Sequence, residues 1–337
     1  MFTKLPQSPV CLSCLICSHK APPVIQFLFE SLLKQDWERG DEIIFVDNGI
    51  SEERHQYVKD SLDLLEKIGV HIVHVKETQP GLTNARLKSF EFSKNPWLVL
   101  LDDDNSLKPN ALQFLRRIIS ENNELGGICP RIEPIWAKST PAWMIVLGHH
   151  VLSYNYSTLI QNPMLFAIWK GGMTGIRPPG GGMIIHRSVA ESFVKLCKET
   201  PIIRKLGRVG SRLLACEDFI LYNQIYMLRM PTAYADNIIV EHHIPESRMN
   251  FRYLVRITFW AHFSFGFLGI MRWGKYRVLF SIYRHTGVLI LSMLWNARYM
   301  LLWQVVVGYA TMLAGAWIGA FKGLLDKDAV RISIDPS

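Results

Sequence analysis

The sequence predicts an α/β fold, a doubly wound mixed sheet with flanking helices, followed by a helical, membrane-associated C-terminal region. Between residue 10 and about residue 131, short apolar runs alternate with longer segments of helical periodicity. One of these runs, over 97–101, leads directly into three consecutive aspartates. Beyond residue 245 the composition becomes basic and aromatic, and an uncharged stretch follows over 299–321.

The alternating segments are typical of right-handed βαβ units, which form parallel sheets with helices on both faces. The predicted strands are 10–17, 42–46, 70–75, 97–101 and 126–131. The predicted helices lie near 22–34, 52–68, 83–93 and 109–120. In such sheets a ligand binds beyond the carboxyl ends of the strands, so the residues that follow each strand are the first candidates for a site.

The bulk composition limits the possible classes of protein. With 337 residues and 49% hydrophobic content, the chain can bury one large core or two smaller ones. The formal net charge of +8 favours anionic partners, which include nucleic acid, membrane surfaces and phosphorylated substrates. Cys11, Cys14 and Cys17 lack the fourth cysteine of an iron–sulfur run, so we expect them to pack as small hydrophobes in a reducing compartment.

Polar residues follow three of the predicted strands, at the edge where a ligand is expected. They are Ser18-His19-Lys20, Asp47-Asn48-Gly49 and Asp102-Asp103-Asp104. Three adjacent carboxylates repel one another, and a hard cation such as Mg²⁺ or Mn²⁺ would offset that repulsion while leaving coordination positions for phosphates. The alternative, for Asp47 as well, is a turn in which aspartates cap backbone amides. The absence of G-x-G-x-x-G and P-loop motifs argues against dinucleotide and P-loop ATPase sites.

One arginine and two loops are predicted to lie at the same edge. Arg86 falls in the first turn of a predicted helix, where a cation is unfavourable unless a carboxylate or an anionic ligand lies nearby. The glycines at 180–182 precede an apolar strand, and glycine lets backbone amides approach a ligand closely. The basic segment 199–216 is either a solvated surface or a flap that closes on phosphate.

Two later pairs add candidate catalytic and metal-binding groups. Glu217 and Asp218 open a predicted helix, where the helix dipole by itself also favours acids. Glu241, His242 and His243 follow a predicted strand over 234–240. Imidazoles beside a carboxylate are potential metal ligands.

The C-terminal region is predicted to associate with a membrane. Residues 247–284 interleave basic and aromatic residues, which suits either nucleic acid or an anionic membrane interface. The 23 residues of 299–321 carry no formal charge and are long enough to span a bilayer, so we expect a membrane and no nucleic-acid partner. A buried helix is the alternative, and 278–297 is expected to be interfacial or half of a hairpin. Upstream basic residues place the catalytic part in the cytoplasm, at the cell inner membrane. The small residues suited to helix–helix packing are Gly308, Ala314-Gly315-Ala316 and Gly319-Ala320.

Taken together, the motifs resemble the inverting family 2 glycosyltransferases of the GT-A fold, of the membrane-associated bacterial polysaccharide type. The resemblance covers about residues 8–245, and its motifs occur in the family's order. They are Val46-Asp47-Asn48-Gly49, Gly81-Leu82-Thr83-Asn84-Ala85-Arg86, Leu101-Asp102-Asp103-Asp104, Gly180-Gly181-Gly182-Met183 and Glu217-Asp218. We divide the chain into a GT-A-like domain over 1–245, a basic amphipathic and transmembrane region over 246–325, and a tail over 326–337.

The resemblance implies a nucleotide-sugar donor and a divalent metal, Mn²⁺ or Mg²⁺. The acid after the second strand, here Asp47, would contact the base. The DxD-like acids, here Asp102 and Asp104, would contact the ribose and a metal that bridges the diphosphate, and Asp103 between them leaves an exchange of roles open. The remaining expected donor-site residues are Asn48, Arg86, Gly181 and Gly182.

The resemblance also implies the roles of the later pairs. Asp218, which follows Glu217, resembles the general base that deprotonates the acceptor hydroxyl. His242 or His243 corresponds to a later metal ligand of some members, and their adjacency leaves the choice open. The absence of a Q-x-x-R-W motif counts against a processive synthase.

The expected activity is the inverting transfer of one sugar, in the manner of a hexosyltransferase, to a hydroxyl of a lipid-linked or polysaccharide acceptor. A metal at Asp104 would stabilise the leaving group, and Asp218 would take the acceptor proton. One alternative is a nucleotidyltransferase or another metal-dependent phosphate-transfer enzyme, whose product would keep a nucleotide in place of a sugar. The other is a non-catalytic membrane scaffold, for which Asp104→Ala would leave the phenotype intact.

Overall fold

The computed structural model describes residues 10–19, 21–141, 143–144, 166–169, 180–208, 217–264, 266–267 and 303–325. Its strands are β1 (Leu12–Ser18), β2 (Glu42–Asp47), β3 (His71–Lys76), β4 (Trp97–Asp102), β5 (Asn105–Leu107), β6 (Gly127–Trp136), β7 (Phe166–Trp169), β8 (Ile184–His186) and β9 (Thr232–Ile244). Its α-helices include α1 (Ile25–Leu32), α2 (Glu52–Lys67), α3 (Leu82–Phe92), α4 (Ala111–Glu121), α6 (Arg187–Glu199), α7 (Glu217–Met227) and α9 (Trp303–Leu325). Two short 3₁₀ helices are η2 (Pro201–Lys205) and η3 (Glu246–Arg248).

The described strands form one mixed sheet in the order β3-β2-β1-β4-β8-β6-β9-β5, with β7 paired to β9. The first four strands of this order are parallel, whereas β8 is antiparallel to β4 and β5 is antiparallel to β9. The register pairs Ser18 with Asp47 and Cys17 with Asp102. The carboxyl ends of β1, β2 and β4 therefore meet at one edge, as the sequence predicts.

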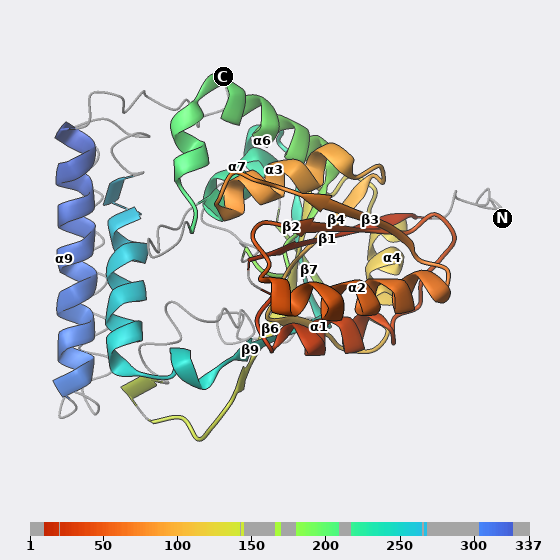
Figure 1. Cartoon of the computed structure of the whole chain (residues 1–337). Coiled ribbons are helices and arrows are strands. Elements are labelled where there is room, and N and C mark those ends of the chain that lie inside the picture. The colour runs from red at the N-terminus through yellow and green to blue at the C-terminus, as the bar shows by residue number, and fades with distance from the viewer. Residues whose placement is uncertain are drawn as a thin grey trace.

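Helices cover both faces of the sheet (Figure 1). The helices α1, α2 and α4 pack on one face, and α3, α6 and α7 pack on the other. Successive residues of a strand point to opposite faces. Cys14 and Ile16 of β1 therefore pack in the core beneath α1, α2 and α4, and Leu15 packs in the core beneath α3, α6 and α7. The buried Cys14 confirms that this cysteine packs as a small hydrophobe.

Each strand and helix predicted between residues 10 and 131 is present, with ends that differ by a few residues. The apolar strand predicted after the glycines at 180–182 is confirmed as β8. The short strand β5 has no counterpart in the prediction because three residues are too few to show a periodic pattern. The longest strand, β9, has 13 residues and extends well beyond the predicted strand over 234–240.

After β9, residues 251–264 form a helix that lies beside α9 (Figure 1). Their contact is close, since a Cβ atom on Gly315 would lie 2.5 Å from the carbonyl oxygen of Phe259. A Cβ atom on Gly319 would collide with the carbonyl oxygen of Phe263, and one on Gly266 with that of Ala316. The predicted packing through small residues is therefore confirmed at Gly315 and Gly319.

No helix in the part of the chain that the structure describes has both the length and the hydropathy needed to cross a membrane. The predicted span over 299–321 falls largely within α9, and it is not supported as a transmembrane segment. Tyr309 and Met312 of α9 are buried in a cluster with Ile244 and Leu254. The side of α9 that carries Tyr309 and Met312 is therefore buried, as the alternative of a buried helix predicts. The predicted interfacial segment 278–297 lies outside the described residues.

Candidate active site

Asp102 is the last residue of β4 and Asp103 is the next residue, and their side chains contact different neighbours. Oδ1 of Asp102 lies 3.4 Å from Nη2 of Arg86, and the Asp102 side chain is 36% exposed. Asp103 accepts a hydrogen bond of 2.6 Å from the hydroxyl of Ser18 on β1. Burial and the Asp104 carboxylate raise the pKa of Asp103 to about 7, although the Ser18 hydroxyl opposes the rise. Both side chains are partly exposed, but the Asp103 carboxylate is engaged by Ser18.

Asp104 is a buried carboxylate held between two cationic groups. Its Oδ2 accepts a hydrogen bond of 2.5 Å from Nη1 of Arg248 and lies 3.5 Å from Nε2 of His242. Burial by itself would raise the pKa of Asp104, but His242 and Arg248 outweigh it and hold that pKa well below its usual range. Arg248 is a site residue that the sequence reasoning missed.

The two adjacent histidines face different surroundings. His242 lies beside Asp104, whereas Nε2 of His243 is 2.8 Å from the Ser106 hydroxyl oxygen. The His243 ring stacks on Phe27 of α1 at a centroid distance of 4.3 Å. The backbone N–H of His243 donates to the carbonyl oxygen of Asp104 at 2.8 Å, within the acidic turn formed by Asp102, Asp103 and Asp104. Because neighbouring strand residues point to opposite faces, only the side chain of His242 reaches the Asp104 carboxylate.

Asn105 organises the acidic turn, although the prediction did not include it among the site residues. Its side chain is buried, and its Oδ1 accepts a hydrogen bond of 3.0 Å from the backbone N–H of Asp102. Its Nδ2 donates to Oδ1 of Asp104 at 3.5 Å. A single amide therefore links the two aspartates that the prediction assigns to ribose and metal.

Arg86 is buried and connects the acidic turn to the pair that opens α7. Its guanidinium donates to the carbonyl oxygen of Gly180 at 2.9 Å, to Glu217 at 3.3 Å and to Asp102 at 3.4 Å. The predicted carboxylate near this arginine is thus confirmed. Burial and the Asp218 charge raise the pKa of Glu217 to about 7, while Arg86 opposes the rise.

Asp218 is the more accessible acid of the pair. Glu217 is buried against Arg86, whereas Asp218 is partly exposed. One carboxylate oxygen of Asp218 accepts a hydrogen bond of 2.8 Å from the backbone N–H of Phe219. Only Asp218 of the two is therefore open enough to meet a substrate.

The glycine turn at 180–182 separates Asp218 from the acidic turn. A Cβ atom on Gly180 would lie 3.0 Å from Oδ2 of Asp218, and one on Gly181 would lie 2.6 Å from Oδ2 of Asp102. Gly182 has a φ of +89°, which only glycine adopts without strain, and its N–H bonds to the carbonyl of Leu100 at 2.8 Å. The three glycines therefore let the chain pass between two groups of carboxylates.

Asp47 is turned toward its own backbone. Its Oδ1 accepts hydrogen bonds of 2.9 Å and 2.8 Å from the N–H groups of Gly49 and Ile50. This is the capped turn that was the alternative for this residue. Oδ2 lies 3.5 Å from Nε2 of His55, so contact with a base stays a prediction.

Asn48 connects the ends of two strands to α3. Its Nδ2 donates to the carbonyl oxygens of Glu77 and Gln79 at 3.0 Å and 2.8 Å, and its Oδ1 accepts from the N–H of Gly81 at 3.0 Å. These bonds fix the loop at the expected donor edge. A direct contact of Asn48 with the donor stays a prediction.

The described part of the basic segment 199–216 packs on the start of α3. The carbonyl oxygen of Arg208 accepts a hydrogen bond of 3.3 Å from the N–H of Leu82. A Cβ atom on Gly207 would lie 2.6 Å from the hydroxyl oxygen of Thr83. The rest of this segment lies outside the described residues, so the choice between surface and flap stays open.

A divalent metal has a chemically suitable pair of ligands at this edge. Among the described residues, no group of three or more His, Cys, Asp and Glu side chains is arranged to hold a metal ion. Asp104 and His242 nevertheless offer a carboxylate oxygen and an imidazole nitrogen to one point, and Mn²⁺ accepts both. Metals that act on phosphates commonly keep few protein ligands and take the remaining oxygens from substrate and water.

Several solved structures are similar to this chain at low identity. A crystal structure of GalNAc-T7 with UDP, GalNAc and Mn²⁺ is 17% identical, with 69% of this chain and 43% of that one covered, at a TM-score of 0.48. Staphylococcus aureus TarS 1-349 in complex with UDP is 13% identical, with 73% and 64% covered, at a TM-score of 0.44. The chain thus spans less than two thirds of either protein chain. No curated protein matches the sequence.

The model of Glycosyl transferase family 2 matches residues 13–178, just under half of the chain. The matched part begins in β1 and contains Asp47, Arg86 and the acidic turn, while Asp218 and His242 lie beyond it. Residues 13–178 therefore resemble a family 2 glycosyltransferase domain.

Proposed function

We propose that this chain is a glycosyltransferase that moves one sugar from a nucleotide-sugar to an acceptor hydroxyl, with inversion at the anomeric carbon and with a divalent metal. The observation that carries the proposal is the buried Arg86, which contacts both Asp102 and Glu217. This contact holds Asp218, which follows Glu217 in the chain, near the carboxylates of the acidic turn. An acid near the acceptor and a separate acidic site for the diphosphate are what an in-line displacement requires.

The acidic turn is the proposed donor site. Breaking the bond between sugar and diphosphate builds negative charge on the leaving group. Asp104 and His242 would hold Mn²⁺ or Mg²⁺, which when bound stabilises such charge as a Lewis acid. Asp102, which is 36% exposed, would face the donor, and Asn105 keeps it in place relative to Asp104.

Asp218 is the proposed general base. Its carboxylate is partly exposed and lies next to Gly180, at the edge of the glycine turn. It would take the proton of the acceptor hydroxyl as that oxygen attacks the sugar. Glu217 is buried against Arg86 and would act as a positioning residue.

Asp218→Asn tests the assignment of the base. A general base contributes about 10²–10⁴-fold, so release of nucleoside diphosphate should fall by that factor while donor affinity is retained. The assay uses a panel of nucleotide-sugars, UDP-sugars first, with Mn²⁺ or Mg²⁺, and calorimetry measures donor affinity. Asp63→Asn, at an exposed position of α2, is the matched control. Full turnover by Asp218→Asn would exclude Asp218 as the base, and transfer of the nucleotide in place of the sugar would exclude the proposed reaction.

We further propose that the acceptor is a lipid-linked or polysaccharide glycan and that region 246–325 holds the enzyme at the cytoplasmic face of the inner membrane. The support is the outward side of α9, where Trp317, Ile318 and Phe321 are 46%, 51% and 64% exposed. In Figure 1 this helix lies at the side of the molecule farthest from the sheet. Apolar side chains on such a helix would enter a lipid interface.

Flotation of the full chain with vesicles that contain anionic lipid tests the membrane part. Trp317→Ser with Phe321→Ser should reduce the bound fraction, because about 25 cal/mol per Å² of buried apolar area would be lost. The exposed polar change Gln56→Ser on α2 is the control. Equal flotation of all proteins would contradict the proposed surface, and efficient transfer only to a soluble protein acceptor would contradict the proposed acceptor.

A further inference from the structure

The Asp104 carboxylate already carries a cation of the protein itself. Nη1 of Arg248 lies 2.5 Å from Oδ2 of Asp104, and Nε2 of His242 lies 3.5 Å from the same oxygen. The side chains of Asp104 and Arg248 are only 6% and 25% exposed. A charge-assisted hydrogen bond that is this short and this well shielded from water is a strong one.

The Asp104 oxygen nearest to His242 is also the one that accepts the hydrogen bond from Arg248, so a metal held by His242 and that oxygen would lie next to the guanidinium group. Two positive charges close together in a site with little water repel each other strongly. The guanidinium group does not lose its proton in proteins, so Arg248 cannot relieve that repulsion by becoming neutral. The arginine and the metal are therefore alternatives at this carboxylate.

We propose that Arg248 is an internal competitor of the divalent metal, which neutralises Asp104 while the metal is absent and is displaced when the metal binds. The inference rests on the metal site of the proposed function. Arg248 lies outside the motifs that resemble the glycosyltransferase family. The affinity for the metal would then depend on a balance between two cations.

The position of Arg248 in the fold allows its side chain to leave. It is the last residue of η3, between the end of β9 and the helix over 251–264. Its own backbone N–H is bonded to the carbonyl oxygen of Pro245 at 2.9 Å. The main chain is thus held by local turns, and the side chain can turn away without unfolding the strand that carries His242.

A titration with Mn²⁺, followed by the electron paramagnetic resonance signal of the free ion, tests the inference on the full chain. Arg248→Ala should bind Mn²⁺ about tenfold more tightly than the natural protein, within the usual range of coupling between two ligands. Arg248→Gln keeps a donor without the charge and should also bind more tightly. Arg252→Ala, at an exposed position of the following helix, removes the same charge away from Asp104 and should leave the affinity unchanged.

Asp104→Asn separates the two levels of the proposal. If the natural protein binds Mn²⁺ through Asp104 but neither Arg248 variant binds it more tightly, the competition is excluded and the metal site stands. If no protein of the series shows binding that Asp104→Asn removes, both the metal site and the competition are excluded. The result for Asp218→Asn is independent of either outcome, and urea unfolding of Arg248→Ala confirms that the variant is folded.

Discussion

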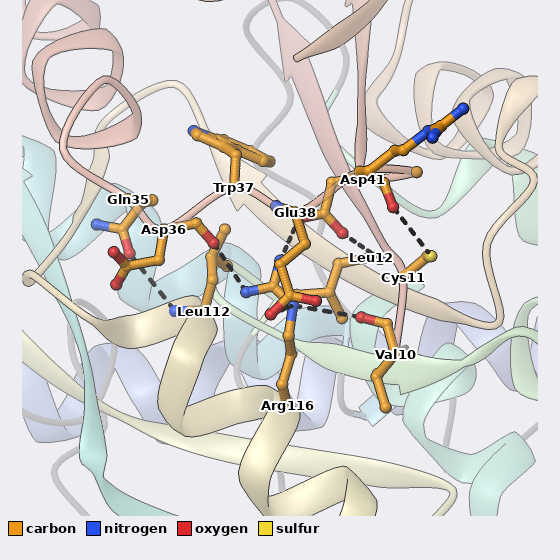
Figure 2. Close-up of polar contacts among 12 residues, drawn as sticks. Val10, Cys11, Leu12, Gln35, Asp36, Trp37, Glu38, Asp41, Leu112 and Arg116 are labelled. Atoms are coloured by element: carbon orange, nitrogen blue, oxygen red, sulfur yellow. Dashed lines mark hydrogen bonds and ion pairs between the residues drawn. The ribbon is translucent and has the colours of Figure 1, made fainter. Parts of the chain in front are cut away.

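Two arginine–carboxylate clusters lie at opposite ends of the strands of the same sheet. One of them stabilises the fold, and the other belongs to the candidate active site. At the amino-terminal edge, Arg116 of α4 pairs with Asp41, the residue before β2 (Figure 2). The Asp41 carboxylate also accepts hydrogen bonds of 2.9 Å from the N–H groups of Leu12 and Glu38. Arg116 donates in addition to the carbonyl oxygen of Asp36 at 2.8 Å. The protein itself satisfies this cluster.

At the carboxyl-terminal edge, the acids outnumber the arginines. The acids are Asp102, Asp103, Asp104, Glu217 and Asp218, and the arginines that contact them are Arg86 and Arg248. The ion pairs of Arg86 with these acids are long, at 3.3 Å and 3.4 Å. A satisfied cluster holds loops together, whereas an excess of one charge at a strand end leaves a place for cationic and phosphate ligands.

The largest expected effect is on the satisfied cluster. Arg116→Met leaves the buried Asp41 without its cation, so the free energy of unfolding should fall by about 3–5 kcal/mol. Urea denaturation followed by circular dichroism measures the loss. Arg117→Met is the matched control, since the Arg117 side chain is 76% exposed and its ion pair is worth about 0–1 kcal/mol. Equal stability of the two variants would remove the basis of the comparison.

The next effect is on catalysis. Arg86→Met should lower kcat by about 100-fold, or ~2.7 kcal/mol of activation free energy, because Asp218 and Asp102 lose their common partner. The accompanying loss of stability should be smaller than for Arg116→Met, since Glu217 can take up a proton when its arginine is removed. Steady-state kinetics and urea denaturation measure both quantities. Partial rescue of kcat by Arg86→Lys would support a positioning role, whereas unchanged kcat with a large loss of stability would make Arg86 structural.

The smallest effect is a pH dependence of stability. In the folded protein burial raises the pKa of Glu217 to about 7 from its ordinary 4.5, so unfolding releases a proton between these pH values. The free energy of unfolding should therefore fall as the pH rises through this window. Asp103, whose pKa is also raised to about 7, contributes a slope of the same sign. Glu217→Gln should therefore reduce the slope without abolishing it, and urea denaturation from pH 4.5 to pH 8 measures the difference. A steeper slope in the variant would contradict the assignment.

The fold of residues 10–131 could be predicted because its signals are local. Apolar runs and helical periods show where strands and helices lie, and alternation of the two predicts a parallel sheet. The 299–321 stretch was misleading because uncharged length alone cannot distinguish a membrane span from a helix packed on its neighbour. The glycines Gly315 and Gly319 were the useful signal there, since they form the contact with the helix over 251–264.

The site was predictable as a set of motifs but not as an arrangement. The sequence shows that three aspartates are adjacent, but not that Asp103 turns to Ser18 while Asp104 turns to Arg248. Arg248 was counted among the basic residues of the C-terminal region, and its position shortly after His242 was the available signal. Long-range contacts of this kind depend on the twist and register of the whole sheet, which no local pattern contains.

The contacts of the active site also have a consequence for how the enzyme folds. Arg86 and Glu217 are 131 positions apart in the chain, and Asp104 and Arg248 are 144 apart. Contacts across such distances form slowly, because the entropy of closing a long loop has to be overcome before the contact can stabilise anything. Within the first half of the chain the closures are shorter, since Ser13 and Glu42 are 29 positions apart and Ser18 and Asp103 are 85 apart. We therefore expect the candidate active site to be among the last parts of the molecule to assemble during refolding.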